Sequence, residues 1–155
     1  MSAIENLLSQ SLPGTWELLS RVDVTANGDQ RVEPVLGAEP VAMLFYDRSG
    51  HFAAQFMKRD RSNAVAASVT VYDPGSSHSN NSRPIGGYDA YFGDYEVDDR
   101  SNLVKQTLRG ALSVESVGLV VERTMVVDGD RLTISLLTTS GAESVTRTLT
   151  WKRIG

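Results

Sequence analysis

The side chains that could do acid–base or metal chemistry in this sequence are few and scattered. It has only two histidines, His51 and His78, so a three-histidine zinc site cannot be built. The chain has no cysteine, which excludes a thiol nucleophile, a disulfide and a thiolate metal site. No Gly-x-Ser-x-Gly motif marks a serine nucleophile. We therefore expect neither a metal nor a cofactor.

The enzymatic option that remains is a reaction that needs only positioning and one or two proton movements. The first candidates for catalysis are His51, Tyr91 and Asp94, with Arg123 as a charged partner. Each of these side chains also has an ordinary structural role open to it, in a turn, an aromatic core or an ion pair. The catalytic residues are therefore left unassigned.

Arginine occurs on the apolar face of two segments that alternate like strands. In the last segment one face carries Val145, Arg147, Leu149, Trp151 and Arg153. Residues 119–127 have valine on both faces and so indicate the inward face less clearly, and we favour the face that carries Val121, Arg123 and Met125. An inward arginine is costly unless it is paired, hydrogen-bonded or stacked. Two interpretations stay open: one arginine stacks over Trp16 while the other reaches solvent at a rim, or an inward arginine binds a carboxylate, enolate or carbonyl oxygen of a ligand.

The most aromatic segment of the chain covers residues 88–96. It places Asp89, Tyr91, Gly93 and Tyr95 on one face, where tyrosine hydroxyls could orient a bound molecule. The glycine inside the segment predicts a bulge or a close backbone approach.

Both faces of residues 51–57 are partly apolar, so alternation does not decide whether His51 and Gln55 point inward. On an inward face they would add the few polar groups that orient a small molecule in an apolar cavity. The complete set of expected ligand-binding residues is Tyr46, His51, Gln55, Tyr91, Tyr95, Gln106, Arg123 and Arg147.

Short alternating runs separated by turn residues continue along most of the chain, which predicts an all-β fold. Tight connectors rich in glycine, asparagine and aspartate favour hairpins between neighbouring strands, and an up-and-down meander of about eight strands removes its edges by closing into a barrel. The expected strands are Gly14–Val24, Val41–Tyr46, His51–Met57, Tyr88–Val97, Leu103–Gly110, Gly118–Val127, Arg131–Thr138 and Val145–Ile154. In the first strand we expect Trp16, Leu18, Val22 and Val24 to face inward and Thr15, Glu17, Arg21 and Asp23 to face outward.

Two segments fall outside this pattern. Ile4, Leu7 and Leu8 are spaced for one face of a short N-terminal helix. Residues 58–87, between the third and fourth expected strands, are long and polar for a loop. Three interpretations stay open: a lid over the barrel mouth, a mobile insertion, and a contact in a crystal or an oligomer.

Length and charge narrow the classes of function. The 155 residues suit a single domain covering residues 1–155, and a formal net charge of −4 argues against nucleic acid as a partner. No apolar run is long enough to span a membrane, and the first residues lack a secretory signal, so we expect a cytoplasmic protein. A homodimer is compatible with the sequence.

Five segments, in order along nearly the whole chain, resemble a bacterial and fungal family of small lipocalin-like domains. The resemblance implies a calycin-type barrel with an interior cavity, and some relatives accompany natural-product pathways of secondary metabolism. Many members carry histidine in the strand where this chain has Gln106, so no acid–base histidine is carried over there. The segments are residues 14–20, 44–57, 90–97, 129–133 and 149–153.

These observations predict a protein that binds a small apolar or amphipathic metabolite in the barrel interior. The alternative is a cofactor-free isomerase, cyclase or dehydratase that acts on a small hydrophobic metabolite.

Overall fold

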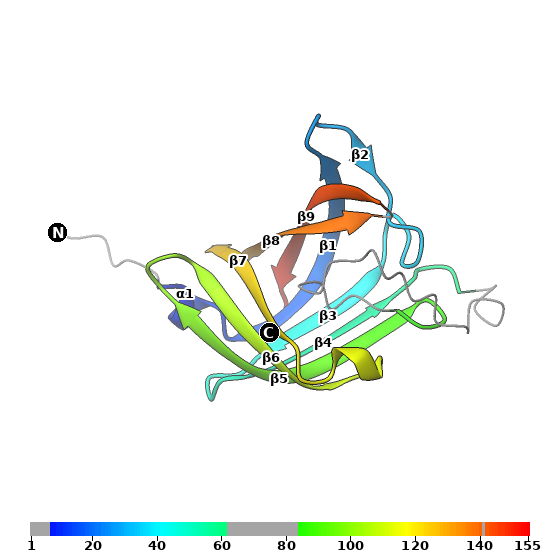
Figure 1. Cartoon of the computed structure of the whole chain (residues 1–155). Helices are drawn as coiled ribbons and strands as arrows, with labels where there is room; N and C mark the ends of the chain where they lie inside the picture. Colours follow the sequence, from blue (N-terminus) through cyan, green and yellow to red (C-terminus); the bar gives the residue numbers. More distant parts are fainter. Residues whose placement is uncertain (1–6, 62–83, 141) are drawn as a thin grey trace.

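The computed structural model describes residues 7–61, 84–140 and 142–155. Over these ranges the chain forms one short helix and nine strands (Figure 1), and the eight expected strands are present with ends within two residues of their predicted positions. The elements are α1 (Leu8–Ser11), β1 (Gly14–Thr25), β2 (Gln30–Arg31), β3 (Val41–Tyr46), β4 (His51–Met57), β5 (Tyr88–Asp98), β6 (Leu103–Ala111), a 3₁₀ turn (Val114–Ser116), β7 (Val120–Asp128), β8 (Arg131–Ser140) and β9 (Glu143–Arg153).

The strands form a closed antiparallel barrel. Each strand from β3 to β9 pairs with its neighbour in the chain, β1 pairs with β3, and β1 also pairs with β9, which closes the sheet on itself. The short β2 pairs with the end of β1 outside this circuit. Tight turns link the hairpins where the sequence predicts them, with Gly50 at φ 96° and Asn102 at φ 57°. The predicted up-and-down barrel is therefore confirmed.

One end of the barrel is closed by α1 and the last residues of β9. Leu8 and Leu12 of this end are buried, and the indole N–H of Trp16 donates to the Leu12 carbonyl at 3.0 Å. The Arg153 guanidinium lies 4.3 Å from the centre of the Trp16 ring and donates to the Pro13 carbonyl at 2.8 Å. The stacking interpretation is confirmed for Arg153. The expectation that the other arginine reaches solvent is wrong, because Arg147 is buried against Asp23.

A bulge at Leu19 changes which residues of β1 face the interior. Before the bulge the inward residues have even numbers, and after it the inward residues are Arg21 and Asp23, both buried. The expectation that Val22 and Val24 face inward is wrong, because one extra residue in a strand exchanges its two faces.

A second irregularity lies between β5 and β6 at Gly93. The register shifts between Phe92 and Gly93, and a Cβ atom at Gly93 would lie 1.8 Å from the carbonyl oxygen of Thr107. Only glycine permits this approach, so the predicted close backbone contact is confirmed.

The wall of the barrel is incomplete between β7 and β8. Their ladder pairs residues 124–128 with residues 131–135 and ends there, although both strands continue beyond it. Figure 1 shows the two strands separating away from their turn. A hollow lies between the diverging halves, and Val120, Arg123, Leu136 and Leu137 are among the residues that line it.

The connection between β4 and β5 is described only at its two stems. The backbone N–H of Lys58 donates to the Gly87 carbonyl at 2.6 Å, and the Arg61 guanidinium donates to the Gly86 carbonyl at 2.9 Å. The remainder, residues 62–83, lies outside the described residues, and so does the expected choice between a lid, an insertion and a crystal or oligomer contact. Of the helical residues that the structure describes, none belongs to a helix both long and apolar enough to cross a membrane.

Candidate functional site

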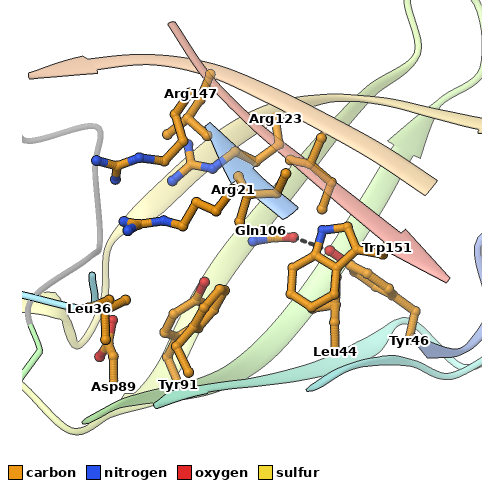
Figure 2. A pocket seen from close by; sticks show the side chains of 14 residues that line it. Arg21, Leu36, Leu44, Tyr46, Asp89, Tyr91, Gln106, Arg123, Arg147 and Trp151 are labelled. Atoms are coloured by element: carbon orange, nitrogen blue, oxygen red, sulfur yellow. Dashed lines mark hydrogen bonds between the residues drawn. The ribbon is translucent and has the colours of Figure 1, made fainter. Parts of the chain in front are cut away.

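The barrel interior contains a cavity, shown with its lining side chains in Figure 2. The enclosed volume of the cavity is about 50 Å³, within a larger concavity that opens to solvent. This space is narrow compared with the usual volume of a small-molecule site, about 300–1,000 Å³. The cavity suits a slender or flat molecule.

One end of the cavity is apolar. Leu44, Phe56 and Trp151 come from β3, β4 and β9, where their alternating positions point them inward, and all three are buried. The rings of Phe56 and Trp151 meet edge to face with centroids 5.8 Å apart. This end therefore offers flat hydrophobic contacts without a charge.

Three arginines from three strands line another part of the cavity. Arg21 of β1, Arg123 of β7 and Arg147 of β9 extend side by side into it in Figure 2. Arg147 donates two hydrogen bonds to Asp23, at 2.8 and 2.9 Å, and the exposed fractions of these two side chains are 4% and 2%. Arg21 lies 3.2 Å from a carboxylate oxygen of Glu33.

Burial raises the free energy of the charged forms of these groups. It lowers the pKa of Arg21 and of Arg123, and the nearby positive charge of Arg147 lowers both further. Guanidinium groups nevertheless stay protonated in proteins. The cavity therefore contains three clustered, partly dehydrated guanidinium groups, of which Arg147 is paired with Asp23 and Arg21 with Glu33.

Tyr46 and Gln106 form a buried hydrogen bond at the apolar end of the cavity, with 2.5 Å between the phenol oxygen and Oε1. Burial raises the pKa of Tyr46 well above its ordinary value, so its hydroxyl stays protonated and donates. Because the amide oxygen of Gln106 accepts this proton, its NH₂ group is turned away from Tyr46, and Figure 2 shows it directed toward the arginine side of the cavity.

Tyr91 stands between the aromatic and the arginine parts of the cavity. Its ring stacks on Phe56 at 6.2 Å and meets Phe52 at 6.0 Å, while its hydroxyl points toward Arg21 in Figure 2. Asp89, two residues earlier on the same face of β5, is buried and also lines the cavity.

The structure brings together five of the eight expected ligand-binding residues. Tyr95 is buried but lies outside the cavity lining, and its hydroxyl donates to the Asp47 carbonyl at 2.5 Å. The five in the cavity lining are Tyr46, Tyr91, Gln106, Arg123 and Arg147.

His51, Gln55 and Asp94 lie on the outer face of the barrel and not at the cavity. His51 and Asp94 are about half exposed, with 3.8 Å between the imidazole and the carboxylate. The backbone N–H of His51 donates to the Asp47 carboxylate, which lowers the pKa of Asp47 and gives the histidine a place in the β3–β4 turn. Gln55 accepts a hydrogen bond from the Tyr88 hydroxyl.

Sequence reasoning missed Arg21, Asp89 and Trp151 as members of the cavity lining. Asp89 and Trp151 share strand faces with Tyr91 and Arg147, so their parity was the signal that could have found them. Arg21 had no such signal, because its inward direction depends on the bulge before it.

Among the residues that the structure describes, no three acidic, histidine or cysteine side chains are grouped so that they could hold a metal ion. A family model described as a lipocalin-like domain matches residues 13–154 of the sequence. No curated protein matches the chain.

Proposed function

The chain belongs to the lipocalin-like domain family, and from this premise we propose that it binds a small amphipathic molecule inside its barrel. The observation that carries the proposal is the two-sided lining of the cavity. Leu44, Phe56 and Trp151 offer apolar contacts on one side, while arginines supply charged donors on the other. Pockets with mostly apolar walls and a few convergent polar groups are typical of small-molecule sites.

Arg123 and Arg147 are the proposed anchors for the polar end of the ligand. A guanidinium binds a carboxylate, an enolate or a carbonyl oxygen through directed N–H donors. Arg123 and Leu136 line both the cavity and the hollow between β7 and β8, so this end of the site lies next to solvent. A ligand can therefore place its apolar part against Trp151 and its polar part near the opening in the wall.

Catalysis is the rival function, as a cofactor-free isomerase, cyclase or dehydratase. It needs proton-moving groups at the ligand, and two of the three candidates, His51 and Asp94, lie on the outer face of the barrel. Tyr91 alone of the three lines the cavity. This placement favours binding over catalysis, and recovery of a bound ligand that the protein has not changed chemically would support the same choice.

Two slender probes test the binding function. Both 4-phenylbutanoate and butylbenzene have an aromatic ring and a short chain, and only the first has a carboxylate. We expect 4-phenylbutanoate to raise the melting temperature by mass action. At a concentration of a hundred times Kd it should add about 2.7 kcal/mol to the free energy of unfolding. Butylbenzene should bind more weakly. A complete absence of stabilisation and of calorimetric heat with a series of such phenylalkanoates would refute the function.

A further inference from the structure

We propose that the apolar end of the cavity recognises an uncharged acceptor oxygen of the ligand, such as that of a ketone or an ester. This inference rests on the proposed binding function and specifies the ligand further. Two N–H donors carry it: the indole N–H of Trp151 and the side-chain amide of Gln106.

The indole N–H of Trp151 is a buried donor that has no hydrogen-bond acceptor among the described residues. The side chain is 1% exposed, and Figure 2 shows the indole nitrogen on the edge that faces Gln106 and the arginines. A buried N–H group without an acceptor costs free energy, so it is rare in native proteins and is usually explained by a further partner. The other tryptophan is different, because Trp16 donates to the Leu12 carbonyl at 3.0 Å.

The amide of Gln106 supplies a second donor from the neighbouring wall. Its oxygen is occupied by the Tyr46 hydroxyl, whose raised pKa keeps it protonated as a donor. With the oxygen so placed, the NH₂ group of the same amide faces the cavity. Tyr46 acts here as a positioning residue for Gln106.

The surroundings of these donors select the charge of the acceptor. Leu44 and Phe56 make this part of the cavity apolar, and the guanidinium groups lie on the other side of the cavity in Figure 2. A carboxylate is better placed against the arginines, while a carbonyl oxygen costs less to dehydrate and can accept from both donors. The ligand is therefore expected to have an uncharged oxygen near its aromatic or apolar part, separate from any acidic group held by the arginines.

A pair of probes that differ by one oxygen tests this subsite. 4-Oxo-4-phenylbutanoate has the carbon skeleton and carboxylate of 4-phenylbutanoate and adds a ketone next to the ring. We expect calorimetry on the unaltered protein to show about five- to tenfold tighter binding of the ketone, the scale of one or two hydrogen bonds to neutral donors. Equal or weaker binding of the ketone would overturn the subsite.

Three variants show which residues are responsible for the tighter binding of the ketone. Trp151→Phe and Gln106→Leu each remove one donor, and we expect each to reduce the advantage of the ketone to about twofold or less while the binding of 4-phenylbutanoate changes less. Trp16→Phe is the matched control, since it removes an indole N–H that already has an acceptor outside the cavity lining. It should retain the full advantage. A melting curve for each variant shows that the barrel is still folded.

The outcomes separate the subsite from the function on which it rests. If 4-phenylbutanoate binds and the ketone shows no gain, the acceptor subsite is wrong and the binding function stands. If the gain persists in both Trp151→Phe and Gln106→Leu, the oxygen is recognised elsewhere and the assignment to these residues is wrong. If neither probe binds, the proposed function fails and the subsite fails with it.

Discussion

Replacement of Arg147 by methionine should destabilise the barrel strongly, because it leaves the carboxylate of Asp23 buried without its cation. The two side chains are 4% and 2% exposed and share two hydrogen bonds of 2.8 and 2.9 Å, so little water can compensate for the loss. Removal of one partner of a buried ion pair typically costs about 3–5 kcal/mol. At about 2–4 °C per kcal/mol for a chain of this size, the melting temperature should fall by about 6–20 °C.

A double-mutant cycle isolates the ion pair from the packing of the arginine stem. Arg147→Met and Asp23→Leu are measured alone and together by urea unfolding at pH 7. We expect the double variant to be much more stable than the sum of the two single losses predicts, because it leaves no buried charge alone. The account of Arg147 and Asp23 as a buried ion pair would be refuted if the two losses of unfolding free energy were additive, or if Arg147→Met alone lost less than about 1 kcal/mol.

The Arg147→Met variant also serves in a second experiment, which tests whether an arginine anchors the ligand. Arg123→Met is compared with Arg147→Met for the binding of 4-phenylbutanoate. If an arginine holds the carboxylate, its removal should weaken binding by about 1.5–3 kcal/mol, the scale of a hydrogen bond to a charged group. Unchanged affinity in both variants would contradict the anchor.

Three further predictions concern the frame around the cavity. Arg153→Met should lower the unfolding free energy by about 2–3 kcal/mol through loss of stacking and carbonyl contacts, with ligand affinity unchanged by calorimetry. Gly93→Ala should lower the free energy of unfolding, measured by thermal denaturation, by at least about 3 kcal/mol, because the alanine Cβ would collide with the Thr107 carbonyl. Hydrogen bonds from Ser9 lower the pKa of Asp99, so their stabilisation is present above the ordinary carboxyl pKa of 3.8 and is lost as the pH falls through the lowered value. NMR titration of Asp99 should show this lowered pKa, and Ser9→Ala should move it back toward 3.8.

Several features of the fold follow from local sequence patterns. Alternation and turn residues predict the eight barrel strands because a half-buried strand requires one apolar face and each tight hairpin requires glycine, asparagine or aspartate. The same alternation places Arg123 and Arg147 on the inner face, where the structure has them. Gly93 predicts the close backbone approach in β5, since a side chain there would collide with the neighbouring strand.

The membership of the site depended on contacts that one strand cannot reveal. The sequence could not place His51 and Gln55, because β4 has apolar residues on both faces. Only the pairing of β4 with β3 and β5 decides which face covers the core, and both residues lie on the other face. The binding subsite at Trp151 depends on Tyr46 and Gln106, which come from strands 60 residues apart.

By itself, the sequence determined the antiparallel barrel, most of its strand ends and the inward arginines, because these depend on local alternation and turn chemistry. Only the tertiary structure decided that Arg21 and Asp23 point into the barrel. A single bulge at Leu19 reverses the faces of β1, and beyond it Asp23 meets Arg147 across a separation of 124 residues. The physical reason is that a buried carboxylate needs a partner, and only the closed barrel brings Asp23 of β1 against Arg147 of β9.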